Sequence, residues 1–162
     1  MIQQPVRMDS TGWKILELLQ KDARISFAEL GRKIGLSTPA VAERVRKLED
    51  AGVITGYHAA LNITKLGLPI RVLIRLTIHG GDLQVKRAIA VIREMAEVAR
   101  CYRVTGQESF VLEADVVSVR HLEELIDKLS SLGTTATSTV LSCPVERREY
   151  CRVEIEKLEK HL

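Results

Sequence analysis

A short stretch of the chain combines hydroxyl groups with cationic side chains, a combination suited to binding a polyanion. Ser37 and Thr38 stand at its start, and Arg44, Arg46 and Lys47 follow. Guanidinium and ammonium groups neutralise phosphates, whereas hydroxyls can hydrogen-bond to base edges. The spacing therefore predicts a surface that binds DNA.

The elements that position these groups are two helices joined by the turn Gly35-Leu36-Ser37. Ser26 and Glu29 have the spacing of a capping box, which predicts the start of the first helix. Thr38-Pro39 predicts the start of the second, with threonine as the N-cap and proline in the first turn. Two helices joined by so short a turn, with bases on the second, are typical of a helix-turn-helix.

Helical periodicity divides the second helix into two faces. Val41, Val45 and Leu48 recur on one side and are expected to face the core. The predicted DNA-binding residues are Ser37, Thr38, Pro39, Ala42, Glu43, Arg44, Arg46 and Lys47. Arg44 lies nearer the core, where it either contacts a phosphate or pairs with an acid of its own domain. The pattern also fits solvated charges on an ordinary three-helix domain.

A second group of polar residues surrounds a glycine between two predicted strands. It consists of Thr105, Gly106, Gln107, Glu108 and Ser109. As structure, this segment is a turn built on glycine. As a site, it offers backbone amides, hydroxyls and a carboxylate, which suit a small zwitterion such as an amino acid.

No constellation in the sequence predicts catalysis. His58, His79, His121 and His161 are scattered and lack neighbouring ligands at metal-binding spacing. There is no phosphate-binding loop, dinucleotide fingerprint or nucleophile elbow. We therefore expect neither catalytic residues nor a metal or cofactor, and the protein is predicted not to be an enzyme.

Composition is that of a chain that buries a core. It has 162 residues, of which 46% are hydrophobic and 28% charged. No apolar run approaches the roughly 20 residues of a membrane span, and the start lacks a secretory signal. Three cysteines without paired spacing fit a reducing compartment, so a cytoplasmic location without membrane attachment is expected. The net charge is only +3, so DNA binding depends on a local basic surface.

Beyond the helices the pattern changes to short strands alternating with helices. The expected order after residue 69 is βαββαβ, which favours an antiparallel sheet with both helices on one face. The predicted fold class is α+β, a three-helix helix-turn-helix domain followed by a ferredoxin-like βαββαβ domain. The expected boundaries are 1–60 for the first domain, 61–69 for a linker, 70–144 for the second domain and 145–162 for a tail.

The tail is rich in charged residues and has two interpretations. Val153, Ile155, Leu158 and Leu162 are spaced so that they form an apolar side of a terminal helix that supports assembly. A solvated tail fits the composition equally well.

Several motifs together resemble the Lrp/AsnC, or feast/famine, family of bacterial and archaeal transcription regulators. The resemblance covers roughly residues 8–143. The matching segments are Asp22-Ala23-Arg24-Ile25-Ser26, Glu29-Leu30-Gly31, Gly35-Leu36-Ser37, Arg44-Val45-Arg46-Lys47-Leu48-Glu49, Gly52-Val53-Ile54-Thr55-Gly56-Tyr57 and Leu66-Gly67. This combination is more specific than a generic helix-turn-helix.

The resemblance implies a sequence-specific regulator of transcription that binds double-stranded DNA. It further implies homodimers whose sheets pack together and that often assemble into octamers, with amino-acid effectors bound between dimers near Val104-Thr105-Gly106. The family usually has Asp where this chain has Gly12 and Ser109, and Glu108 is adjacent to the second position. Siroheme decarboxylases share the architecture, so an enzyme of that kind is the alternative.

Overall fold

The computed structural model describes residues 6–159 and contains two compact units. One unit comprises the residues up to Ala60 together with those from Val145 onward, and the other is Leu61–Pro144. The elements are α1 (Ser10–Lys21), α2 (Phe27–Ile34), α3 (Thr38–Asp50), the 3-10 turn η1 (Ile63–Leu66), β1 (Ile70–Thr77), α4 (Asp82–Arg93), β2 (Val98–Arg103), β3 (Phe110–Val116), α5 (Val119–Ser130), β4 (Thr134–Thr139) and α6 (Arg152–Glu159). None of these described helices is long and apolar enough to cross a bilayer.

The three N-terminal helices enclose a core of their own. Its buried members are Ile15, Leu19, Leu30, Val41, Val45 and Leu48. Three of them, Val41, Val45 and Leu48, form the predicted apolar stripe of α3 and fix that face of the helix inward. The opposite face of α3 is therefore the one that remains available for contacts.

Local capping decides where these helices begin. Asp9 accepts a hydrogen bond from the Gly12 N–H (2.7 Å), and Ser26 accepts one from the Glu29 N–H (3.2 Å). The Glu29 carboxylate pairs with Lys33. The N-cap of α3 is Ser37 and not Thr38 as expected, because the extended backbone of Ser37 precedes a helix that already includes Thr38.

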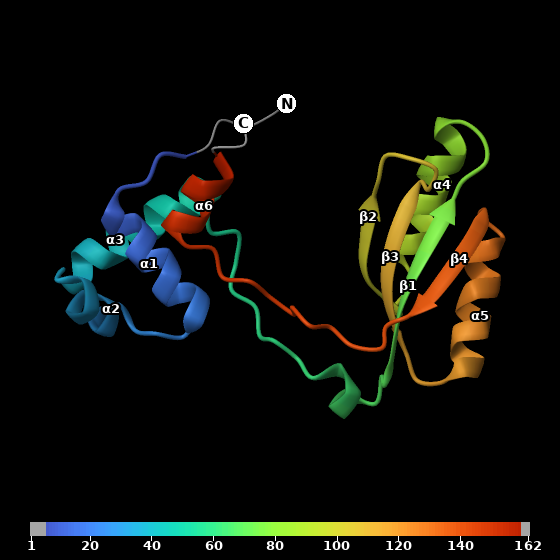
Figure 1. Ribbon diagram of the computed structural model, residues 1–162, viewed down its shortest axis with the longest axis horizontal. Helices are drawn as coiled ribbons and strands as arrows, with labels where there is room; N and C mark the ends of the chain where they lie inside the picture. Colours follow the sequence, from blue (N-terminus) through green and yellow to red (C-terminus); the bar gives the residue numbers. More distant parts are fainter. Residues whose placement is uncertain (1–5, 160–162) are drawn as a thin grey trace. The chain divides into compact units, whose positions relative to one another are not determined.

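The second unit is a four-stranded antiparallel sheet in the order β2-β3-β1-β4. Ile74 at the centre of β1 lies opposite Leu112 of β3 and Thr137 of β4. Helices α4 and α5 cover one face of the sheet (Figure 1), and the alternate residues Val72, Ile74 and Leu76 are buried beneath them. This βαββαβ order, with the helix-turn-helix before it, confirms the predicted α+β class.

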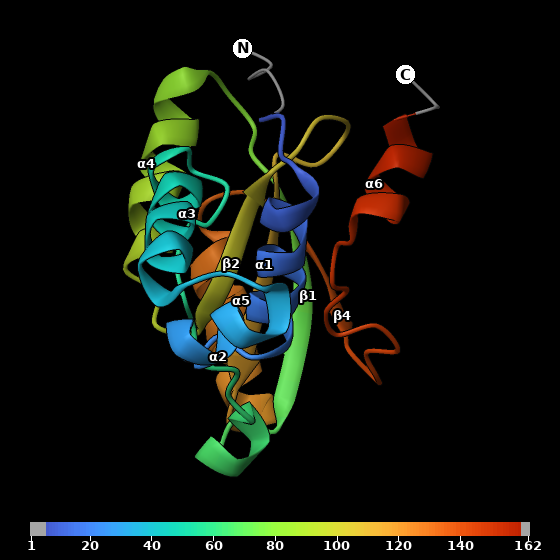
Figure 2. The same cartoon turned by 90° about the vertical axis from the view of Figure 1, so that its left-hand side faces the viewer.

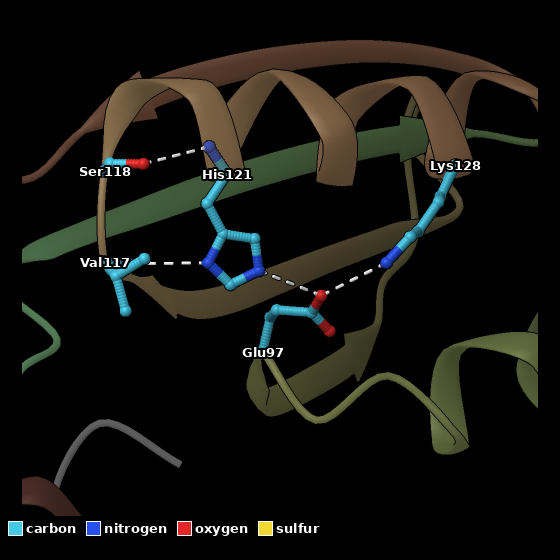
Figure 3. Close-up of polar contacts among 5 residues, drawn as sticks. All are labelled: Glu97, Val117, Ser118, His121 and Lys128. Atoms are coloured by element: carbon cyan, nitrogen blue, oxygen red, sulfur yellow. Dashed lines mark hydrogen bonds and ion pairs between the residues drawn. The ribbon is translucent and has the colours of Figure 1, made fainter.

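A polar cluster ties α5 to the start of β2 (Figure 3). Glu97 accepts a hydrogen bond from His121 Nε2 (3.2 Å) and pairs with Lys128 Nζ (3.3 Å). His121 Nδ1 lies 3.5 Å from the Val117 N–H, so the ring contacts the chain on both sides. The backbone N–H of Glu97 itself, and then His121 and Lys128, lower the pKa of the Glu97 carboxyl. The cluster thus holds α5 against the residue that precedes β2.

The chain beyond the second unit returns to α1. The side-chain amide of Gln20 donates to the Tyr150 carbonyl oxygen and accepts from the Tyr150 N–H, both at 2.9 Å. Helix α6 follows, with Val153 and Leu158 exposed. The predicted terminal helix is therefore present, but two of its apolar residues face solvent in this single chain, and Leu162 lies outside the described residues.

Candidate DNA-binding and effector-binding sites

The turn that presents α3 depends on a close approach between two backbones. The Leu36 N–H donates to the Gly31 carbonyl oxygen (2.9 Å). A Cβ at Gly31 would overlap the Leu36 carbonyl oxygen, so only glycine fits here. This contact fixes where α3 begins relative to α2.

The start of α3 has hydroxyl groups that the fold does not use for capping. Ser37 is the N-cap residue, yet its side chain makes no capping hydrogen bond. Ser37, Thr38 and Pro39 are all exposed, and Ala42 is half-buried one turn further on. The first turn of α3 therefore has exposed hydroxyls and apolar groups at the positions that the sequence singled out.

The exposed bases of α3 share one acidic partner. Glu43 forms an ion pair with Arg46 and another with Lys47, at 3.6 Å for the lysine. Both basic side chains are mostly exposed. Ion pairs at this spacing on a helix surface contribute little to stability, because water screens them. A phosphate can therefore replace Glu43 as partner of either base at small cost.

Arg44 has a different role from its neighbours. Its guanidinium donates to Asp9 Oδ2 at 2.8 Å, so it pairs with an acid of its own domain, the second of the two expected possibilities. The Gly12 N–H and Arg44 together lower the pKa of Asp9, whose other carboxylate oxygen caps α1. Arg44 thereby joins α3 to the start of α1.

The predicted effector residues lie on the loop between β2 and β3, which extends beyond the ends of these strands (Figure 2). Gly106 has φ +119°, a conformation that disfavours side chains, although the space around it is open. The Val104 N–H donates to the Ser109 carbonyl oxygen (3.2 Å) and closes the loop. Thr105 and Gln107 are exposed on it.

Ser109 is turned toward the end of β1 and not toward solvent. Its hydroxyl accepts from the Ile78 N–H (3.0 Å), and its own N–H donates to the Leu76 carbonyl oxygen (2.9 Å). The neighbouring Glu108 is half-buried and has no ion-pair partner among residues 6–159. Of the five predicted residues, Ser109 thus supports the loop, while Thr105, Gln107 and Glu108 retain free polar groups.

Sequence reasoning did not identify the ion-pair partners in this region. An acid of the same domain was one expected partner of Arg44, but Asp9 lies 35 positions away and nothing in either local pattern singles it out. The double pairing of Glu43, by contrast, follows from its spacing of three and four residues from Arg46 and Lys47, which is the spacing of helical neighbours.

Two family models match the chain. Residues 8–49 match the AsnC-type helix-turn-helix domain, and residues 71–150 match the Lrp/AsnC ligand binding domain. Among curated relatives, the transcriptional regulator LrpC of Bacillus subtilis is 36% identical over 137 residues, or 85% of this chain and 94% of its own. The leucine-responsive regulatory protein of Rhizobium meliloti is 32% identical over 93% of this chain and 97% of its own.

Solved structures agree with these matches. The structure of Bacillus subtilis LrpC covers 88% of this chain with a TM-score of 0.82 and 34% identity, and all of its own length is matched. A transcriptional regulator from Neisseria meningitidis in complex with L-Met covers 92% of this chain, with 99% of its own length matched, a TM-score of 0.84 and 26% identity. The helix-turn-helix, the βαββαβ unit and both family models thus place the chain in the Lrp/AsnC family of DNA-binding transcriptional regulators with a ligand-binding domain.

Proposed function

We propose that α3 enters the major groove of double-stranded DNA and gives the regulator its sequence specificity. Ser37, Thr38 and Ala42 meet base edges, while Arg46 and Lys47 contact phosphates. The observation that carries this proposal is that α3 has two distinct faces. One face is buried in the core, and the other carries basic side chains whose only ion-pair partner in the described residues is the exposed carboxylate of Glu43. Arg44 positions the helix through Asp9.

Selection of bound duplexes from a random pool tests this assignment. The wild-type protein and the Thr38→Ala variant are compared, with Thr64→Ala on the η1 turn as a control at an exposed threonine outside α3. We expect Thr38→Ala to change the preferred bases and Thr64→Ala to leave them unchanged. If all three proteins select the same DNA sequences, Thr38 does not contact base edges.

The DNA-binding form is proposed to be a homodimer or a multiple of it, up to an octamer. The sheet face that α4 and α5 leave uncovered carries Leu73 and Tyr102, which are 40% and 51% exposed. On the same face, Arg71 makes two hydrogen bonds to Asp115 at 2.7 and 2.9 Å. A mixed apolar and ion-paired surface of this kind suits packing against a second copy. Sedimentation as a monomer at micromolar concentration would exclude it.

An amino acid is the proposed effector, bound at the loop of Thr105, Gly106, Gln107, Glu108 and Ser109 between assembled dimers. The support is the free carboxylate of Glu108, the open backbone at Gly106 and the L-Met complex of the Neisseria meningitidis regulator. Binding changes assembly only if the two oligomeric states differ in affinity for the effector. A cytoplasmic location is part of the same proposal, because a regulator of transcription must reach the DNA that it controls.

Calorimetry against the twenty amino acids tests the effector proposal, with wild type compared with Gly106→Asp. At least one amino acid is expected to bind wild type and to lose affinity in the variant. Unchanged affinity in Gly106→Asp would place the effector elsewhere, and the absence of binding by any of the twenty would reject an amino-acid effector.

A further inference from the structure

The N-terminal unit contains a cavity that belongs neither to the α3 face nor to the effector loop. Its volume is about 380 Å³. Trp13, Leu16 and Leu19 of α1 line one side, and Ile54 and neighbouring residues of the segment after α3 line another. All the lining residues belong to the unit that contains α1–α3 and the chain from Val145 onward.

The remaining wall is the chain between the sheet and α6, which contributes Arg147 and Tyr150. This wall is fixed, because the Gln20 side chain makes both a donor and an acceptor hydrogen bond with the Tyr150 backbone, as a neighbouring β-strand would. The anchoring residue, Gln20, itself lines the cavity. The C-terminal segment therefore completes the cavity.

The chemistry of the lining points to one class of ligand. The indole of Trp13 and the aliphatic side chains of Leu16 and Ile54 form apolar walls. The Tyr57 hydroxyl is already used as a donor to Glu49 (3.0 Å). Arg147 has neither an ion pair nor a hydrogen bond to any residue in the described part of the chain, so its guanidinium is available for an anion.

We infer that this cavity binds a small carboxylate with an aromatic or branched apolar body. The body packs against Trp13 and Leu16, and the carboxylate pairs with Arg147 at the C-terminal wall. The volume lies within the range of about 300–1,000 Å³ typical of small-molecule sites, toward its lower end. Such a ligand contacts both α1 and the C-terminal segment, so its binding stabilises their association.

Trp13 is the only tryptophan of the chain, so its fluorescence reports on this cavity alone. The experiment titrates the full-length protein with phenylacetate and, separately, with the uncharged phenylacetamide. We expect phenylacetate to change the emission of Trp13 saturably and to protect it from acrylamide quenching. Phenylacetamide is expected to bind at least about tenfold more weakly, because it lacks the charge that pairs with Arg147.

Arg147→Gln is compared with the matched variant Arg148→Gln, an exposed neighbour that does not line the cavity. Arg147→Gln should weaken phenylacetate binding about tenfold and leave phenylacetamide binding unchanged, whereas Arg148→Gln should behave as wild type. Coinciding thermal unfolding curves establish that both variants are folded.

Three results would overturn the inference. They are no saturable response to phenylacetate, equal affinity for the acid and the amide, and equal losses in the two arginine variants. Protection of Trp13 from acrylamide before any ligand is added would also overturn it, since a second copy of the chain would then cover the cavity. None of these outcomes bears on DNA binding by α3.

Discussion

The start of α3 and the loop between β2 and β3 both present serine, threonine and charged groups, yet the fold uses them differently. Ser37 is an N-cap residue whose hydroxyl makes no capping hydrogen bond, whereas the Ser109 hydroxyl holds the Ile78 N–H. In α3 the apolar face and the Arg44–Asp9 pair hold the helix, so the hydroxyls of its first turn are not needed for that purpose. In the loop some side chains support the backbone. Substituting the same residue type should therefore change stability by different amounts in the two regions.

The largest expected change in stability comes from substituting the glycine of each region, Gly31 before α3 and Gly106 in the loop. Gly31→Ala places a methyl group against the Leu36 backbone carbonyl oxygen, an overlap that the turn cannot relieve without shifting α3. We expect it to lower the free energy of unfolding by about 3 kcal/mol. At Gly106 the space for a methyl group is open, so Gly106→Ala should lower the free energy of unfolding only through the strain of its positive φ, by about 1–2 kcal/mol.

Urea unfolding of the two glycine variants and the wild type measures both values. DNA binding supplies the second readout. Because Gly31 fixes the start of α3, Gly31→Ala should also weaken DNA binding, whereas Gly106→Ala should leave it intact in the absence of effector. Equal losses of stability in the two variants would contradict the distinction between steric overlap and backbone strain.

A smaller effect is expected from the serines themselves. Ser109→Ala leaves the Ile78 N–H without its acceptor in a half-buried position and should cost about 1 kcal/mol of unfolding free energy. Ser37→Ala removes no hydrogen bond and should change stability by less than about 0.5 kcal/mol. Chemical denaturation measures both. A larger loss for Ser37→Ala than for Ser109→Ala would reverse the comparison.

Another small effect concerns Glu97 and the dependence of stability on pH. The carboxyl has a lowered pKa in the folded protein, so its contribution to stability is fully present above the unfolded value, about 4.3. That contribution is lost as pH falls through the lower, folded pKa. Wild type should therefore exceed Glu97→Gln in stability at neutral pH, by less than about 1 kcal/mol given the partial exposure of Lys128.

Thermal unfolding of wild type and Glu97→Gln between neutral and acid pH measures this difference. The two curves should converge as the pH falls below about 4. A difference that stays constant down to acid pH would show that the Glu97 charge contributes nothing.

Much of the fold follows from periodicity in the sequence. The alternating burial along β1 and the apolar stripe of α3 can both be predicted, because the apolar residues recur at the period of a strand in the first and of a helix in the second. The cap of α3 was misplaced by one residue, since Ser37 and Thr38 are equally good caps by type. Their backbone angles, which tertiary packing sets, decide between them.

The contacts between distant residues could not be predicted in the same way. Gln20 and Tyr150 are 130 positions apart, and their hydrogen bonds use the backbone of Tyr150, which has no residue-specific pattern. The cavity that this contact completes was therefore missed. The candidate DNA surface was accessible to sequence reasoning because all of its residues lie on one helix and its first turn.

The salt dependence of DNA binding by the variant that carries both Arg46→Ala and Lys47→Ala tests the central claim most directly. Each lost phosphate contact should lower the slope of log affinity against log salt by about 0.9, so the double variant should lose about 1.8. At about 0.1 M salt, this corresponds to roughly 60-fold weaker binding. The matched control is Lys86→Ala with Arg87→Ala, two exposed bases of α4 in the other unit, which should leave the slope unchanged. A slope for the α3 variant equal to that of wild type would contradict the assignment of α3 as the DNA-binding helix.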